Sequence, residues 1–141
     1  MLAAGVQPAS WEALRQQSDY VSLHTPLTVA TWLMLNAPTL ALMKPGAYLI
    51  NTARGLLVDD AALLEAVNKR GIAGAALDVL AAEPPPPDHP LLNHERIFVT
   101  PHCAWCSEES DEAVWEWAAG YVAAVFRGER PDAAVNSVNI K

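Results

Sequence analysis

The sequence predicts a parallel α/β fold, because short apolar segments alternate with segments of helical pattern along most of the chain. Segments near residues 19–24, 47–51, 72–79 and 97–100 have the lengths of strands in a sheet. Helical patterns follow the first, second and fourth of these segments, as right-handed crossovers between parallel strands require. We therefore expect about four parallel strands with flanking helices, in a single domain covering residues 1–141.

The first half of the chain is predicted to hold two short helices, each followed by a strand. Ser10 can cap a helix because its hydroxyl accepts a backbone N–H. Pro38 suits a first helical turn, where a missing N–H leaves no bond unmade, and Pro45-Gly46 stops the helix before it. The expected elements are a helix over residues 11–17, a strand over 19–24, a helix from Asn36 or Thr39 to Lys44, and a strand over 47–51, buried on both faces.

Acidic residues and glycines mark the elements of the second half. Asp59 and Asp60 open a helix, where the helix dipole favours carboxylates, and Gly71 ends it. Four successive prolines, residues 84–87, are compatible with neither helix nor strand pairing. The expected elements are a helix over residues 60–69, a strand over 72–79, a rigid turn over 83–90, a strand over 97–100, and a last helix from about Ser107 to Gly128.

The last helix carries an apolar stripe at helical spacing. Its members are Trp115, Ala118, Ala119, Val122, Val125 and Phe126. We expect this stripe to pack in the core. Trp117 and Tyr121 lie off the stripe, where they would be exposed or would contact a neighbouring domain.

Composition excludes several classes of function. The net charge of −7 argues against binding to a nucleic-acid backbone, which needs a basic patch. No apolar run approaches the length of a membrane span, and the first ten residues lack the pattern of a signal peptide. Two cysteines do not suggest a disulfide-stapled secreted domain. A cytoplasmic protein that binds neither nucleic acid nor membrane is expected.

Cys103 and Cys106 form a C-x-x-C motif beside His102. A redox pair or half of a zinc site is one interpretation of this spacing. A structural zinc site needs four ligands, and the sequence has no second C-x-x-C motif to supply them. We therefore predict that the protein holds no metal.

Arg54 follows the predicted strand 47–51 at its carboxyl end. This is the edge where open α/β sheets bind ligands, and a guanidinium is a permanent cation whose planar fork matches a carboxylate. The plainer interpretation is an exposed arginine in a loop.

Five motifs occur in the order and at the separations of a known family. They are Leu23-His24-Thr25-Pro26, Asn51-Thr52-Ala53-Arg54-Gly55, Ala76-Leu77-Asp78-Val79, Glu83-Pro84 and Thr100-Pro101-His102. Together they resemble the D-isomer-specific 2-hydroxyacid dehydrogenases, over about residues 10–136. The run from His102 to Glu108, with Val135-Asn136 after the last helix, resembles the C-terminal-binding-protein branch.

The resemblance implies a fold, a cofactor and a site. The fold is the Rossmann-type, doubly wound parallel sheet of an NAD-binding domain, and the activity is NADH-dependent reduction of a 2-oxo acid. Arg54, Glu83 and His102 match the catalytic positions, with Arg54 and Trp105 at the substrate. The positions matching the cofactor site are Thr25, Pro26, Thr52, Ala53, Arg54, Asp78, His102 and Ala104. A capping role for Asp78 at the end of its strand is the plainer interpretation.

The family's G-x-G-x-x-G fingerprint and the acidic residue that follows it do not occur in these 141 residues. We therefore expect the C-terminal part of an NAD-binding domain, without its first βαβ unit and without the catalytic domain. Such a chain is expected to be inactive in isolation, because a helix N-terminus normally holds the pyrophosphate. Three hypotheses remain open: part of an enzyme, a non-catalytic binding or scaffold module, and a truncated gene product. A separately encoded N-terminal half or a second copy could complete it.

Overall fold

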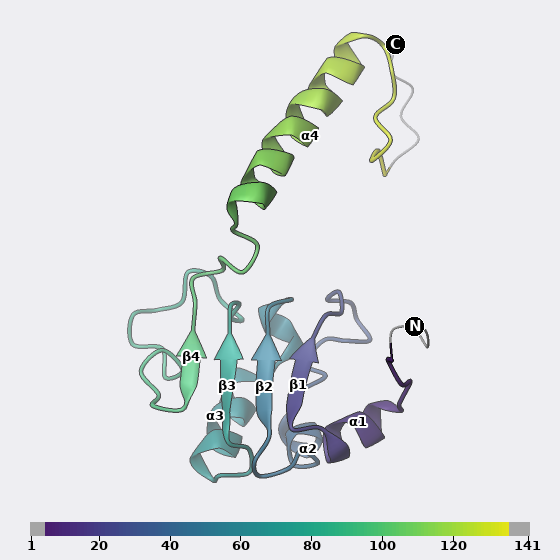
Figure 1. The fold of residues 1–141 in the computed structure, drawn as a ribbon. Helices are drawn as coiled ribbons and strands as arrows, with labels where there is room; N and C mark the ends of the chain where they lie inside the picture. Colours follow the sequence, from purple (N-terminus) through teal and green to yellow (C-terminus); the bar gives the residue numbers. More distant parts are fainter. Residues whose placement is uncertain (1–4, 136–141) are drawn as a thin grey trace. The chain divides into compact units, whose positions relative to one another are not determined.

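A computed structural model describes residues 5–135, which fall into two compact units, residues 5–104 and residues 105–135 (Figure 1). The first unit holds a four-stranded parallel sheet in the order β1-β2-β3-β4. Its strands are β1 (Tyr20–Leu23), β2 (Tyr48–Asn51), β3 (Gly74–Leu77) and β4 (Ile97–Val99). Its helices are α1 (Trp11–Gln17), α2 (Ala37–Leu40), the 3₁₀ helix η2 (Gly55–Leu57) and α3 (Asp60–Asn68). The predicted α/β fold with four parallel strands is confirmed.

Side-chain caps set the helix starts that the sequence predicted. The Ser10 hydroxyl accepts the N–H of Ala13 at α1, and Asn36 with Thr39 forms a capping box at α2. The Asp59 carboxylate accepts two backbone N–H groups at the start of α3, from Ala61 and Ala62. Each of these bonds satisfies a donor that the first helical turn leaves without an intrahelical partner.

The sheet of the first unit is packed on one face only, which contradicts the expected burial of β2 on both faces. Along the strands, buried residues alternate with more exposed ones, as the two-residue period of a strand requires. The packed face contributes Val21, Leu23, Leu49, Ala75, Leu77 and Ile97 to a core that also holds Leu40 of α2 and Leu63 and Val67 of α3. In Figure 1 α2 and α3 lie behind the strands, so residues 5–104 form two layers, whereas the doubly wound sheet that the resemblance implies has helices on both faces.

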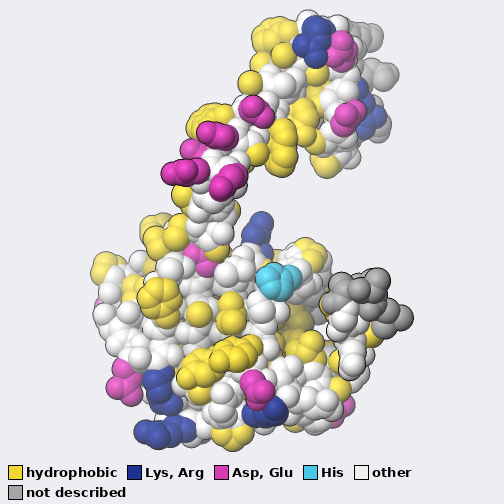
Figure 2. All heavy atoms as spheres, in the orientation of Figure 1, with side chains coloured by type: hydrophobic (Ala, Val, Ile, Leu, Met, Phe, Trp, Pro, Cys, Tyr) yellow, Lys and Arg dark blue, Asp and Glu magenta, His cyan; other side chains and the backbone are white. Residues whose placement is uncertain are grey.

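The other face of the sheet, which we call the open face, carries aromatic side chains. Tyr20 and Phe98 are each 68% exposed, and the rings of Tyr20 and Tyr48 stack with centroids 5.8 Å apart. Apolar side chains lie over the strands on this face, which is turned toward the viewer in Figure 2. The apolar run of residues 47–51 suggested a strand with two buried faces, but Tyr48 keeps one side in contact with solvent.

The second unit consists of α4 (Glu108–Phe126) and the turns that follow it. Ser107 and Ser110 form its capping box, and Pro131 lines a hollow with Tyr121, Val122, Val125 and Phe126. No residue of α4 is buried, so the prediction that its apolar stripe is core is wrong. One helix and a short tail offer too little apolar surface of their own to cover it.

Among residues 5–135, no helix combines the length and the hydropathy that a membrane crossing requires. Val135 ends the described part of the chain, and Asn136, the second residue of the Val135-Asn136 motif, lies outside it.

Candidate active site

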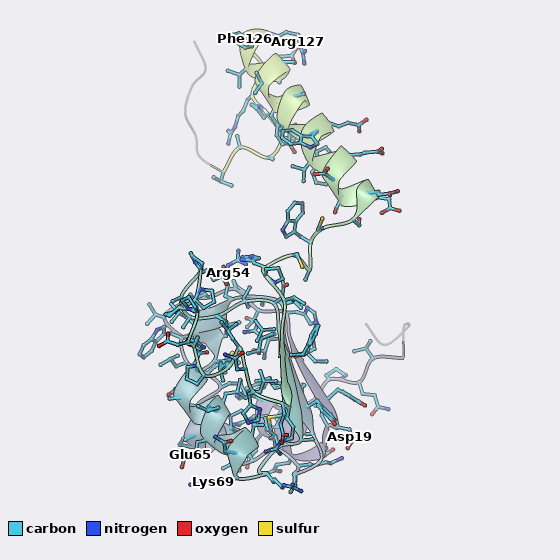
Figure 3. All side chains as sticks on the ribbon, turned by 90° about the vertical axis from the view of Figure 1, so that its left-hand side faces the viewer. Asp19, Arg54, Glu65, Lys69, Phe126 and Arg127 are labelled. Atoms are coloured by element: carbon cyan, nitrogen blue, oxygen red, sulfur yellow. The ribbon has the colours of Figure 1, made fainter. Side chains whose placement is uncertain are left out.

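Arg54, Asp78 and His102 lie at one end of the sheet. Each follows the carboxyl end of a different strand, β2, β3 or β4, and the three strands are parallel. Figure 3 shows Arg54 at the end of the first unit opposite to Glu65 and Lys69. The sheet therefore gathers a cation, a buried acid and an imidazole on its carboxyl edge.

Glu83 and His102 form a direct pair. Glu83 Oε2 lies 2.5 Å from His102 Nδ1, and Glu83 Oε1 accepts the backbone N–H of Leu80 at 3.1 Å. His102 has a positive backbone φ of 53°, a conformation that non-glycine residues seldom adopt. The two side chains are 37% and 49% exposed, so the pair is open to a ligand.

Asp78 is a buried carboxylate with three donors and is only 4% exposed. Its Oδ1 accepts the Thr100 hydroxyl at 2.5 Å and the N–H of Cys103 at 2.9 Å, and its Oδ2 accepts the N–H of Ala104 at 2.9 Å. Burial acts to raise the pKa of Asp78, but these hydrogen bonds, helped by the charge of His102, hold it below its ordinary value. Asp78 therefore fixes the loop that carries His102.

The lowered pKa of Asp78 predicts a specific pH dependence of stability. The pKa of Asp78 is lower in the folded than in the unfolded protein. Ionised Asp78 therefore stabilises the fold at pH values above its ordinary pKa of 3.8. That stability is lost as the pH falls through the lowered pKa. Asp78→Asn should therefore be less stable than the wild type at pH 7, with a smaller difference at pH 3. Urea unfolding at both pH values measures this, and an equal difference at both would contradict it.

The loops after β1 and β2 line an open hollow of about 690 Å³ at the same edge of the sheet. Its lining residues are His24, Thr25, Pro26, Leu27, Thr52, Ala53 and Arg54. The Arg54 side chain is exposed, and its Nη1 donates to the carbonyl of Ala53 at 2.6 Å. Four residues that were predicted to bind the cofactor, Thr25, Pro26, Thr52 and Ala53, thus share one hollow with Arg54.

Two other predicted site residues lie outside that hollow. Ala104 contributes to the site through its backbone N–H, which donates to Asp78 Oδ2. Trp105 belongs to the second unit, where its side chain is exposed and its carbonyl accepts the Ser110 hydroxyl at 2.5 Å.

Sequence reasoning missed two residues that support this edge of the sheet. A Cβ atom at the buried Gly55 would lie 1.9 Å from the carbonyl oxygen of Leu80, so only glycine fits there. The Asp60 carboxylate lies 3.5 Å from His89 Nε2. The position of Gly55 directly after Arg54 was the available signal for the first, whereas no local pattern distinguishes Asp60 from an ordinary first-turn acid.

The C-x-x-C motif contains two thiols that are free and exposed. Among the residues that the structure describes, no group of three or more histidine, cysteine or acidic side chains is arranged to hold a metal ion.

Residues 1–104 match the family model for the D-isomer specific 2-hydroxyacid dehydrogenase, NAD binding domain. The chain is 45% identical to a glyoxylate reductase of Thermofilum pendens over 130 residues, which are 92% of this chain and 38% of that protein. It is 42% identical to the chloroplastic D-3-phosphoglycerate dehydrogenase 3 of Arabidopsis thaliana, covering 96% of this chain and 23% of that protein.

Solved structures agree with the sequence relatives. D-lactate dehydrogenase from Lactobacillus jensenii, solved with NAD⁺, superposes with a TM-score of 0.85 at 37% identity, over 92% of this chain and 43% of that one. The TT0316 protein from Thermus thermophilus superposes with a TM-score of 0.86 at 44% identity, over 91% of this chain and 41% of that one. The chain therefore spans less than half the length of each of these relatives.

Proposed function

The chain belongs to the D-isomer specific 2-hydroxyacid dehydrogenase family, matching its NAD-binding domain, and from this membership we propose that it serves NADH-dependent reduction of 2-oxo acids. The observation that carries the proposal is the contact between Glu83 and His102, at the same sheet edge as Arg54. Reduction of a 2-oxo acid requires a proton at the carbonyl oxygen and a cation for the carboxylate. These side chains supply both.

His102 is the proposed proton donor and Arg54 the proposed substrate anchor. Imidazole titrates near neutral pH and can therefore give and take a proton during turnover. Because Nδ1 bonds to Glu83, Nε2 is the ring nitrogen that exchanges the proton with the substrate, and Glu83 orients the ring. The Arg54 guanidinium pairs with the substrate carboxylate and polarises the adjacent carbonyl.

The hollow and Asp78, which lie at the same edge of the sheet, fit a nicotinamide cofactor. The Oδ2 atom of Asp78 accepts one N–H and, as a carboxylate oxygen, has capacity to accept a second from a carboxamide. Thr25, Pro26, Thr52 and Ala53 would line the nicotinamide ribose side, and Ala104 would fix Asp78. When bound, NADH supplies the hydride for the carbonyl carbon.

A chimeric enzyme tests this function. Residues 1–141 would replace the matching segment of the Thermofilum pendens glyoxylate reductase, and NADH oxidation would be followed with glyoxylate and pyruvate as probe substrates. We expect turnover of at least one of these acids. A folded chimera that binds NADH but reduces neither acid would contradict the proposal.

Arg54→Ala should raise the KM of the chimera for its 2-oxo acid by roughly 10- to 100-fold, because hydrogen bonds to charged groups contribute about 1.5–3 kcal/mol. Arg54→Lys should recover only part of the loss, since a single ammonium cannot form the planar two-point contact. Lys69→Ala, at the opposite end of the unit (Figure 3), is the control cation and should leave KM unchanged. An unchanged KM in Arg54→Ala would remove Arg54 from substrate binding.

The run from His102 to Glu108 supports a place in the C-terminal-binding-protein branch, whose scaffold role is the alternative function, and Trp105 would then lie near the substrate. The paired Glu83 and His102 favour the enzyme. The proposed partners are a 2-oxo or 2-hydroxy acid and either an N-terminal half or a second copy. The two free cysteines support the proposed cytoplasmic location.

A further inference from the structure

Asp60, the first residue of α3, holds the loop that connects β3 to β4, residues 78–96. Its carboxylate lies 3.5 Å from His89 Nε2 and accepts the backbone N–H of Ala81. The Asp60 and His89 side chains are only 19% and 18% exposed. One carboxylate therefore contacts both the beginning and the middle of this loop.

The ring of His89 lies with its Nε2 atom 3.5 Å from the Asp60 carboxylate. The backbone N–H of Leu91 lies 3.4 Å from His89 Nδ1, which makes Nδ1 the acceptor and leaves the ring proton on Nε2. The His89 N–H donates to the carbonyl of Pro86, and the neighbouring Leu91 is buried in the core. The contact with Asp60 therefore restrains a loop segment that the bond to Pro86 and the burial of Leu91 already hold in place.

The loop that Asp60 contacts also contains Glu83. The turn of residues 80–83 is closed by the Leu80 N–H on Glu83 Oε1, and Ala81, which donates to Asp60, is the next residue of that turn. Glu83 Oε2 then contacts His102 Nδ1. We propose that Asp60 is a positioning residue for His102, acting through the turn of residues 80–83; its effect on turnover rests on the function proposed above.

A capping role does not account for Asp60. The neighbouring Asp59 already accepts the N–H groups of Ala61 and Ala62 at the start of α3. Burial raises the pKa of the Asp60 carboxyl, and the interactions with His89 and Ala81 only partly offset this, while the charge of Asp59 adds to it. A carboxylate there costs stability, so its contacts with the loop are its contribution to the molecule.

The first test uses NMR on the isotope-labelled 141-residue chain. In Asp60→Ala the ¹⁵N and ¹³Cε1 shifts of the His102 ring should move toward those of Glu83→Ala, because the turn no longer presents Glu83. Glu65→Gln is the matched control: it also removes a carboxylate from α3, where Glu65 is exposed and pairs with Lys69, and should leave the His102 shifts in place. Unmoved His102 shifts in a folded Asp60→Ala variant would overturn the proposal.

A second variant tests the same contact if Asp60→Ala does not fold. His89→Gln removes the same contact from the loop side and should produce the same movement of the His102 shifts. If His89→Gln folds and those shifts stay at their wild-type values, the proposal is equally overturned.

The second test measures turnover in the chimera. Asp60→Ala should lower kcat roughly tenfold, since small misplacement of a catalytic group costs rate steeply. KM should be unchanged, because Arg54 lies on another loop. Asp60→Asn retains an acceptor for the Ala81 N–H, so its kcat should lie between those of the wild type and Asp60→Ala. An unchanged kcat with moved His102 shifts would also overturn the positioning role. A chimera that is inactive with wild-type residues contradicts the proposed function instead, and the NMR result still decides the proposal for Asp60.

Discussion

Gly55→Ala is expected to destabilise the first unit by about 3 kcal/mol, the upper range for overpacking a filled site. The added Cβ would lie 1.9 Å from the Leu80 carbonyl oxygen, 2.0 Å from its carbon and 2.6 Å from the nitrogen of Ala81. All three are backbone atoms, so no side-chain rotation relieves the contact. The segment that begins with Arg54 and the turn that holds Glu83 would have to separate, and the Glu83–His102 pair would be disturbed as well.

Urea unfolding of the 141-residue chain measures this effect, with Gly46→Ala as the control. A Cβ at Gly46 meets no atom within 4 Å, so this substitution should change the free energy of unfolding little. The control separates the steric effect from the general effect of alanine on the flexibility of the unfolded chain. Equal stabilities of the two variants would show that the backbone at Leu80 yields readily.

His102→Ala should lower the turnover of the chimera by roughly 100- to 10,000-fold, the range for loss of a general acid. The structure supplies the reason: the ring contacts Glu83 through Nδ1 at the same sheet edge as Arg54. The affinity for NADH should fall much less, because most of the proposed cofactor contacts come from the loops after β1 and β2. Steady-state kinetics and an NADH titration separate the two effects.

His94→Ala is the matched control for His102→Ala. His94 lies before β4, at the amino end of the strand whose carboxyl end leads to His102, and its Nε2 lies 3.1 Å from Asn68 Oδ1. Its removal should leave kcat within about twofold. Near-normal turnover in His102→Ala would exclude this imidazole as the proton donor.

Local chemistry made much of the fold predictable. The helix over residues 11–17 was predicted with its bounds and its Ser10 cap, because capping depends on near neighbours in the sequence. The strand predictions were too long: residues 72–79 were expected, whereas β3 covers Gly74–Leu77. Apolar character continues past the last ladder bond, so composition alone does not mark the end of a strand.

Long-range packing could not be predicted in the same way. Tyr48 and the stripe of α4 are apolar at the correct spacing, but spacing does not say whether another element covers them. In the site, the shared edge followed from the strand ends alone, because parallel strands align their carboxyl ends. The link from Asp60 to His89 joins residues far apart in the sequence, and nothing near either residue indicates it.

The strand order has a consequence for how the chain folds. Every spatial neighbour in the sheet is also the next strand in the sequence, from β1 to β4. No strand has to enter between two others that have already paired, so the sheet can assemble by adding one strand and its crossover at a time. Because each strand pairs with the next strand in the sequence, the loops that close during folding are short. Short loops lower the entropic barrier to folding relative to a sheet that pairs distant strands. Growth in this manner leaves only the outer sides of β1 and β4 able to accept another strand.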